Sequence, residues 1–599
     1  TVDTTNSGGS SAATVQFGGV VGGTTPVGAI IITGNLNLDG NIIKTSDSTA
    51  GATSINVSGT SDLGANVKTT GNQTYTGNTT VSADITLTGG AQLTFGGTVN
   101  SSSTDSASDT DNLSTVFTET EFDGIVGGTY GLGAIIITGA LDLDANITSA
   151  TSLSVSTTSN LGADVTTSGT QTYSGAVTLS ADNVLTTTAN GNVSFGLTTN
   201  GAQTLSITTD GTGDVTFTDD VGGSAGLNGL TISTNDFNAV DLKVGGTISI
   251  TNTGTSSDIT GVIANDDGDA AVFTKAGAGT LTLSGTNTYT GVTTISNGIL
   301  EITNNDGLGS DTGKTVISSG AQLTLENALT LTENIDIAST GTTAGIYSAS
   351  DIILQGNLVI LGSSSILSEA NLTLNGSGTV TKTTGDSANL HLKAYANIVI
   401  DNSITSTFNA LNLVIIADAD ATTNGSVLIS DNITTNAGHI WIGGGSGSAT
   451  WNGLTVADSF ALANDANNGS LTSIAGKAIL IKNSTISTAA GSFYANGKSN
   501  STVDGVLNIG LGILNSSIQS TTGSITLIGT LAGDYAIGAG ISFGTNQDAV
   551  DSQVTISSTD GNISITGTAS ESASNYSTGD VSEDVKIGIA VITKQFDDY

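Results

Sequence analysis

Side chains able to act on a substrate are scarce in this chain of 599 residues. The two histidines are His391 and His439, and neither stands near a Gly-x-Ser-x-Gly turn, which presents the serine nucleophile of many hydrolases. His391 lies between two leucines in an alternating run, and His439 directly precedes an isoleucine and a tryptophan. These surroundings predict structural roles for both histidines, so we expect no nucleophilic triad.

Adjacent carboxylates occur at two places, Asp219-Asp220 and Asp266-Asp267. A glycosidase needs two carboxyl groups at a set separation across the scissile bond. Neighbouring residues of a strand point to opposite faces, so neither pair meets that requirement. All basic residues are lysines, which also removes the arginine that acts as the base in pectate-lyase-like enzymes. We therefore expect no enzyme, no catalytic residue and no cofactor, with calcium as the one exception to consider.

Two acidic turns offer the carboxylate oxygens that Ca²⁺ prefers. One turn spans residues 265–269 (NDDGD) and the other spans residues 105–112 (DSASDTDN). Neither has EF-hand spacing, because Leu113 and Ala270 stand where a ligand or a glycine is required. Solvated acidic turns are the alternative interpretation. The candidate calcium ligands are Asp266, Asp267, Asp269, Asp109 and Asp111.

Five aromatic residues are candidates for stacking on a ligand. Trp441 and Trp451 flank a Gly/Ser-rich segment, and an exposed tryptophan can stack on a sugar ring. For each aromatic residue the alternative is packing, either by filling a wide coil or by covering the edge of a core. The same place in three similar units (QTYTG, QTYSG and NTYTG) is occupied by Tyr75, Tyr173 and Tyr289.

The segments that must position these side chains have the pattern of short β-strands. Thr, Val and Ile are abundant, glycine occurs 81 times and proline once. Apolar and hydroxyl residues alternate with period 2, as in residues 278–285 (AGTLTLSG), which places leucine on one face and threonine on the other. Short strands with small inward residues and few aromatics favour an all-β, right-handed parallel β-helix (β-solenoid). Tandem β-sandwich modules are the alternative.

Internal repeats indicate how the chain is organised. Residues 17–42 and 122–147 are identical at 18 of 26 positions, and a second pair of similar segments begins at residues 71 and 169. We predict an N-terminal joining segment (1–15), followed by two solenoid repeat modules (16–105 and 106–215). A region around the third tyrosine unit (216–345), a further solenoid (346–569) and a C-terminal joining or capping segment (570–599) follow.

The charge of the chain limits its partners. Acidic residues number 51 against 12 basic ones, and the formal net charge of −39 repels phosphate backbones and anionic membrane surfaces. No run approaches the length of about 18 apolar residues that a membrane helix needs. We therefore expect neither nucleic-acid binding nor membrane insertion. Thr1 and the lack of methionine predict a processed product or an internal segment.

Residues 274–302, TKAGAGTLTLSGTNTYTGVTTISNGILEI, resemble the passenger-associated β-strand repeat of bacterial autotransporters. The matching positions are the Gly-x-Gly-Thr-Leu-x-Leu strand, the Gly-x-Asn-x-Tyr-x-Gly unit, Thr-Thr-Ile and a closing Gly-x-Leu strand. The units at Gln73 and Gln171, and residues 432–451, are similar to filamentous-haemagglutinin-like exoproteins. The resemblance implies a β-helical passenger that is extracellular or on the bacterial cell surface.

These observations predict a non-catalytic structural adhesin or exoprotein rod. Its expected partners are glycans, cell surfaces or copies of itself. The loops 458–468 and 498–504 interrupt the repeats, so we expect them to carry the specificity. The alternative is a self-assembling subunit of an extracellular filament, sheath or surface layer, in which solenoids stack head to tail as a homopolymer.

Overall fold

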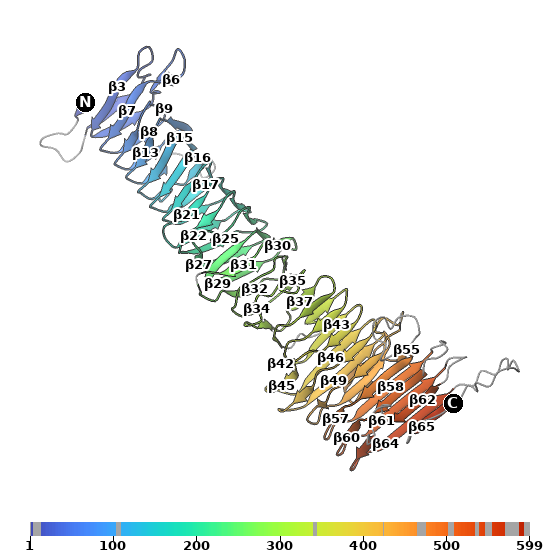
Figure 1. Cartoon of the computed structure of the whole chain (residues 1–599). Helices are drawn as coiled ribbons and strands as arrows, with labels where there is room; N and C mark the ends of the chain where they lie inside the picture. Colours follow the sequence, from blue (N-terminus) through green and yellow to red (C-terminus); the bar gives the residue numbers. More distant parts are fainter. Residues whose placement is uncertain are drawn as a thin grey trace, which may run out of the picture. The chain divides into compact units, whose positions relative to one another are not determined.

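A computed structural model of the chain describes residues 2–3, 13–102, 110–266, 268–338, 344–422, 424–463, 475–500, 508–532, 538–544, 554–569 and 586–591. The regular secondary structure of these ranges consists of β-strands, from β1 (Val2–Asp3) to β65 (Lys586–Val591) (Figure 1). The chain forms two compact units, residues 1–291 and 292–599, and this division falls inside the predicted region 216–345. The predicted joining segments 1–15 and 570–599 lie largely outside the described residues.

Successive coils pair through parallel strands. In unit 1, β18 (Ser159–Leu161) pairs with β21 (Val177–Leu179), which sets Leu161 beside Leu179. In the described part, the named strands that pair antiparallel are two hairpins, β5–β6 (Ile43–Lys44 and Thr49–Ala50) and β53–β54 (Ala449–Trp451 and Leu454–Val456). Parallel pairing of consecutive short strands confirms the parallel β-helix. The β-sandwich alternative is wrong because sandwiches are built from antiparallel sheets, and the right-handed sense stays a prediction.

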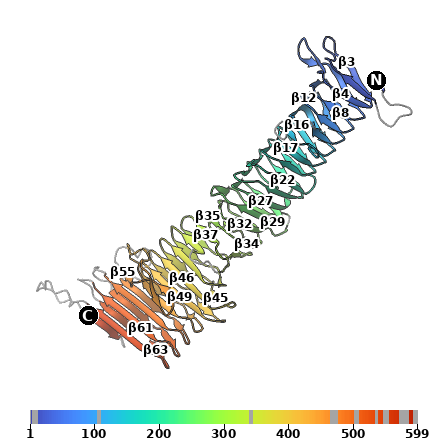
Figure 2. The same ribbon diagram turned by 180° about the vertical axis from the view of Figure 1, so that it is seen from behind.

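Burial alternates along the strands as the period-2 pattern predicts. In β33 (Thr280–Leu283), Leu281 and Leu283 are fully buried while the two threonines are only half-buried. Figure 2 shows from behind how such strands lie side by side within each unit. Within each unit, each coil therefore adds a layer of Leu, Ile and Val to the apolar core, and residues such as Thr115 and Thr199 are buried with them.

Asparagine and aspartate side chains connect the corners of neighbouring coils. Oδ1 of Asn41 accepts the backbone N–H of Asn66 at 2.9 Å, and Oδ1 of Asn66 accepts the backbone N–H of Thr86 at 2.6 Å. Asn66 lies outside the strands, so its N–H would otherwise lack a protein partner. These bonds fix the stacking of one coil on the next.

Unit 2 contains a parallel sheet of nine strands that runs from β38 (Leu329–Leu331) to β65. Near its end, β59 (Asn508–Leu514) and β62 (Gly538–Gly544) face β58 (Phe493–Ser499) and β61 (Ile525–Leu531). Glycines line this interface, and a Cβ added to Gly529 would lie 2.0 Å from the carbonyl oxygen of Gly540. The two sheets thus approach backbone to backbone. In the described residues, no helix is long and apolar enough to cross a membrane.

Candidate ligand-recognition site

The three repeated tyrosines are core residues. Tyr75, Tyr173 and Tyr289 are each 0% exposed. The ring of Tyr75 stacks on Phe95, with centroids 5.5 Å apart, and burial raises the pKa of the Tyr75 hydroxyl. The predicted role of these tyrosines in ligand stacking is wrong, because a ligand cannot reach a ring that is enclosed by successive coils. The packing alternative holds for all three.

A glutamine two residues before each of the first two tyrosines completes a buried polar network. In unit 1, the Tyr75 hydroxyl donates to Oε1 of Gln73 at 3.1 Å, and Nε2 of Gln73 donates to the carbonyl oxygen of Thr88 at 2.9 Å. Tyr173 and Gln171 repeat the arrangement at 3.2 Å. Side chains two residues apart on a strand share a face, so the Gln-x-Tyr spacing was the signal for this pairing.

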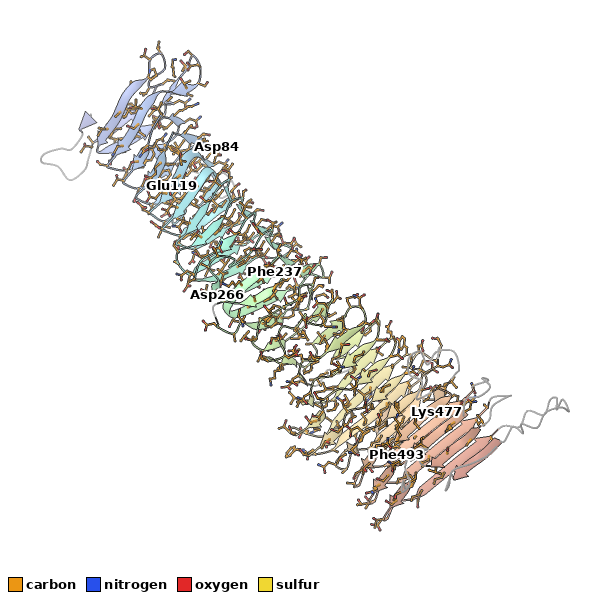
Figure 3. The ribbon with its side chains drawn as sticks, viewed as in Figure 1. Asp84, Glu119, Phe237, Asp266, Lys477 and Phe493 are labelled. Carbon is orange, nitrogen blue, oxygen red and sulfur yellow. The ribbon has the colours of Figure 1, made fainter. Side chains whose placement is uncertain are left out.

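Among the predicted calcium ligands that the structure describes, Asp266, Asp269 and Asp111 do not form a group of three acidic side chains. Asp266, which is labelled in Figure 3, forms an ion pair with Lys243, with 2.7 Å between the two charged atoms. Asp111 accepts a hydrogen bond from the hydroxyl of Ser101 at 3.1 Å. Asp109 and Asp267 lie outside the described residues. In the ranges that the structure describes, neither turn brings three acidic groups together, so calcium binding there stays a prediction.

Three other carboxylates do meet. Oxygens of Glu121, Asp142 and Asp144 all lie within 4.8 Å of one another on neighbouring coils. Burial, followed by the charges of Asp123 and Asp142, raises the pKa values of Glu121 and Asp144, and the charge of Glu119 adds to the effect on Glu121. The first repeat has Gln16, Asn37 and Asp39 at the corresponding positions, and Nε2 of Gln16 donates to Asp39 at 2.7 Å. A comparison of the two repeats was the only sequence signal for this cluster.

Trp441 lies on the outer face of unit 2 beneath a β-hairpin. It belongs to β52 (Ile440–Gly444), which lies between β49 (Leu411–Ala417) and β58, and is 3% exposed. The hairpin β53–β54 covers it with Leu454 and Val456. Without this cover, an outward tryptophan and its neighbours would form an exposed apolar patch. Packing is therefore the role of Trp441, as the alternative interpretation held.

The tip of this hairpin is Trp451-Asn452-Gly453. Asn452 and Gly453 have φ values of 47° and 79°, the left-handed conformation that a tight two-residue hairpin turn needs. Trp451 is half-buried, whereas Asn452 and Gly453 are exposed. We call β53, β54 and this tip the aromatic hairpin. It is an excursion from the coil, because Gly444 and Ser459 exchange backbone hydrogen bonds of 3.3 and 2.9 Å where it leaves and returns.

Four aromatic rings gather under and beside the aromatic hairpin. Trp441 and Tyr494 are stacked, with centroids 5.9 Å apart and an interplanar angle of 5°. Trp451 packs against Tyr494 at 5.8 Å and against His439 at 5.7 Å, the latter in an edge-on arrangement. Trp451, Tyr494 and His439 are all half-buried, so each presents part of its ring to solvent. Such rings can stack on the apolar face of a sugar or on an apolar side chain.

His439 takes the place of an asparagine in a corner ladder. Its backbone N–H donates to Oδ1 of Asn412 at 2.8 Å, and its Nδ1 accepts the backbone N–H of Ser492 at 2.9 Å. Burial lowers the pKa of His439. Burial, and then the charge of Lys393, lowers the pKa of His391 to about 4. Neutral imidazoles in these positions agree with the predicted structural roles.

The two loops expected to carry specificity are neighbours. β55 (Ala461–Ala463) pairs with β58, and this sets Leu462 beside Lys498. Nζ of Lys498 lies 4.9 Å from the centroid of the Phe460 ring. Residues 464–468 and 501–504 of these loops lie outside the described residues. The described parts of both loops flank the aromatic hairpin, so the hairpin and the two loops lie in one region of unit 2.

Comparison with known proteins identifies one segment. Residues 273–302 match the family model of the passenger-associated-transport-repeat. The chain carries an autotransporter passenger repeat. An adhesin autotransporter of Brucella suis biovar 1 (strain 1330), BmaC, is 37% identical over 118 residues, which is 18% of this chain and 3% of that relative. No solved structure matches. The repeat and this relative indicate a secreted protein exposed at the cell surface.

The part of the passenger repeat that lies in unit 1 contains a buried lysine. Lys275 is 0% exposed, and its Nζ donates to the carbonyl oxygens of Ala276 and Gly277 at 2.8 and 3.0 Å. Burial lowers the pKa of Lys275 to about 8. Asn287 stands where the earlier units have glutamine, and its Oδ1 accepts the backbone N–H of Ile263 at 2.8 Å. Lys275 and Asn287 therefore use their polar atoms in hydrogen bonds to the backbone of the chain.

Proposed function

We propose that this chain is a non-catalytic, adhesin-type segment of a bacterial surface passenger. Its coils are the scaffold, and the aromatic hairpin of unit 2 contacts glycans or cell surfaces. The observation that carries the proposal is a group of three half-buried rings, in which Trp451 at the tip of an excursion from the coil packs against Tyr494 and His439. The passenger repeat and the adhesin relative support the same role.

The scaffold role follows from how the coils are held. Corner ladders such as Asn41 to Asn66 to Thr86 satisfy backbone groups between coils, and within each unit the apolar side chains of successive coils are buried. A binding element placed on such a rigid body loses little conformational freedom when it binds. The hairpin is held in turn by the packing of Leu454 and Val456 on Trp441.

The surroundings of the histidines support a non-catalytic role. Nδ1 of His439 already accepts a backbone N–H, and the pKa of His391 is lowered to about 4 by burial and by Lys393. A general base near neutral pH needs a free nitrogen and a pKa close to the working pH. Neither histidine offers both.

Trp451→Ala tests the proposed contact. The variant removes the ring at the hairpin tip, and Thr455→Ala, an exposed residue on the same hairpin, is the matched control. We expect attachment of the purified chain to host cells or to a glycan array to fall at least about tenfold for Trp451→Ala, as for loss of a stacking residue worth more than 1 kcal/mol. Equal attachment of both variants, with unchanged unfolding curves, would reject the hairpin as the contact.

Head-to-tail assembly is the second candidate. In β64 (Ile563–Ala569), Ile563 is 43% exposed, whereas its partner in the preceding coil, Ile525, is 0% exposed. A strand with exposed apolar residues can pair with another chain. Negative-stain microscopy of the purified chain separates the two functions, since regular fibres would favour assembly and single particles would favour the adhesin.

A further inference from the structure

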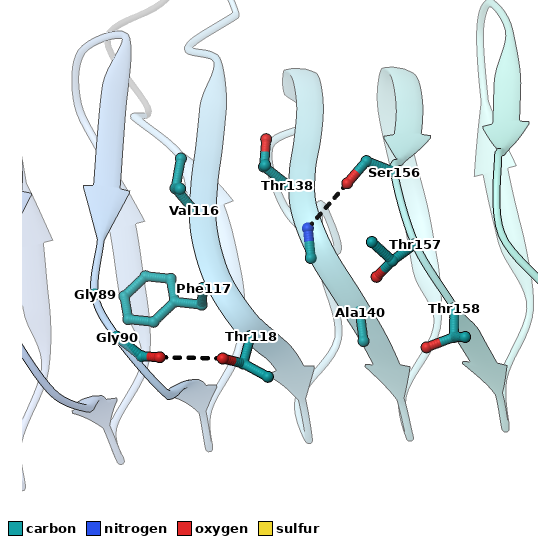
Figure 4. Close-up of a pocket in the computed structure, with 11 residues that line it drawn as sticks. Gly89, Gly90, Val116, Phe117, Thr118, Thr138, Ala140, Ser156, Thr157 and Thr158 are labelled. Atoms are coloured by element: carbon teal, nitrogen blue, oxygen red, sulfur yellow. Dashed lines mark hydrogen bonds between the residues drawn. The ribbon is translucent and has the colours of Figure 1, made fainter.

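A groove crosses the corners of four successive coils in unit 1 (Figure 4). Its volume is about 630 Å³, within the range of sites that hold small ligands. The ring of Phe117 forms its floor and is 5% exposed. Val116, Thr138, Ala140, Thr157 and Thr158 are among the residues that line it, and none of the lining residues is charged.

Bends in two long strands shape the groove. The register between β15 (Leu113–Phe122) and β16 (Leu132–Leu143) shifts between Val116 and Glu119, and Gly139 has a φ of 135° at the same level. The Phe117 ring lies flat there because Gly89 has no side chain. A Cβ at Gly89 would be 2.2 Å from Cε1 of that ring.

The first repeat closes the corresponding corner. The aligned residues are Asn35 for Ala140, and Gly59 for Thr157. There, the backbone N–H of Gly59 donates to the carbonyl oxygen of Gly34 at 2.8 Å, and the backbone N–H of Thr60 donates to Oδ1 of Asn35 at 3.0 Å. The asparagine side chain thus fills the corner and satisfies the turn.

The second repeat leaves this corner open for a steric reason. A Cβ at Gly59 would lie 2.4 Å from the carbonyl oxygen of Gly34 and 2.5 Å from Oδ1 of Asn35, and Thr157 carries that Cβ. Among the residues that the structure describes, the backbone N–H groups of Thr157 and Thr158 have no hydrogen-bond acceptor. Two residues that line the groove therefore have N–H donors without an acceptor, and they lie beside an apolar floor.

We propose that this groove binds an uncharged saccharide. A sugar offers hydroxyl or acetamido oxygens to the N–H groups of Thr157 and Thr158, and apolar C–H faces to Phe117 and Val116. The uncharged lining gives no counter-charge to an ionic ligand, and the net charge of −39 repels anionic ones. The groove uses residues of unit 1 alone, so it is a second site that does not depend on the aromatic hairpin.

The repeats themselves supply the test variant. Ala140→Asn combined with Thr157→Gly installs the residues of the first repeat, so it should fill the groove and restore both backbone hydrogen bonds. We expect the full chain to bind neutral tetrasaccharides of glucose, mannose or N-acetylglucosamine in saturation-transfer NMR and calorimetry. The double variant should weaken that binding at least about tenfold, as for loss of two hydrogen bonds. Its melting temperature should not fall.

A second variant guards against an effect on folding. Thr138 is exposed, so Thr138→Glu adds a carboxylate to the groove without touching the core, and it should also abolish binding. The proposal is overturned if no neutral tetrasaccharide binds at millimolar concentration, if sulfated or uronic-acid oligosaccharides bind better, or if both variants bind as the wild type does. Trp451→Ala should leave this binding unchanged, which separates the groove from the hairpin.

Discussion

The hydroxyl of Tyr75 donates a hydrogen bond to Oε1 of Gln73, and the amide of the same glutamine donates to the carbonyl oxygen of Thr88 in the next coil. The pair joins an aromatic core residue to the backbone of a corner. Tyr173 and Gln171 repeat it in the second repeat, where the glutamine bonds to the carbonyl oxygen of Thr186 at 2.9 Å.

Gln73→Leu should destabilise unit 1, because it leaves the buried hydroxyl of Tyr75 without its partner. The carbonyl oxygen of Thr88 still accepts the backbone N–H of Thr69 at 2.8 Å. A buried group that loses its partner costs about 1–3 kcal/mol, so we expect a loss of that size in denaturant unfolding. Gln171→Leu is the matched variant and should lose a similar amount. Tyr75→Phe, which removes one bond and leaves Gln73 its other partners, should cost about 1 kcal/mol. Equal stability of wild type and both leucine variants would contradict this account.

Glu333 should make unit 2 less stable as the pH rises. It is 6% exposed, one oxygen accepts the hydroxyl of Thr315 at 2.9 Å, and burial, followed by the charge of Asp311, raises the pKa of Glu333 to about 8. The folded state therefore holds a proton that the unfolded chain releases near its ordinary pKa of 4.5. Stability is greatest below that pH, falls as the pH rises through this window, and levels off above about 8.

Glu333→Gln keeps the hydrogen-bonding shape without the charge, so it should flatten that dependence. The measurement is urea unfolding of the full chain at a series of pH values. A wild-type profile that is flat over this window, or one that Glu333→Gln leaves unchanged, would show that the carboxyl is ionised in the folded protein.

His439 should produce a loss of stability in acid. Its Nδ1 accepts the backbone N–H of Ser492, and burial lowers the pKa of His439. The unfolded chain binds a proton at a higher pH than the folded chain does, so stability is present above the ordinary histidine pKa of 6.5 and is lost as the pH falls below it. His439→Asn should keep the ladder, as Asn412 does one coil earlier, and remove the acid sensitivity. His439→Ala should lower the stability, measured by denaturant unfolding, both above and below the ordinary histidine pKa of 6.5.

Gly529→Ala should disrupt the close approach of the two sheets in unit 2. The added methyl group would lie 2.0 Å from the carbonyl oxygen of Gly540, which is backbone and cannot rotate away. We expect a loss of about 3 kcal/mol or more, as for other overpacked cores, seen as a lower melting temperature. Gly28→Ala is the control, because nothing lies within 4 Å of a Cβ added there. Equal melting of the two variants would contradict the close packing.

Sequence alone determined the strands and the face that each residue of a strand presents. In β33, the alternation of leucine and threonine fixes which side chains point inward, because side-chain direction along a strand is a local property. The similarity between the repeats and the resemblance of residues 274–302 to the passenger-associated repeat together predicted a passenger-type β-helix.

Only the tertiary structure decided which coils meet and what covers their outer faces. Oxygens of Glu121 and Asp142 converge, and His439 bonds to Ser492 across 53 positions of sequence, because an excursion lengthens that coil. Coil length sets such contacts, and it varies along the chain, so no fixed spacing in the sequence predicts them. The cover over Trp441 and the open corner at Thr157 also depend on neighbours from other coils, whose arrangement a local pattern does not record.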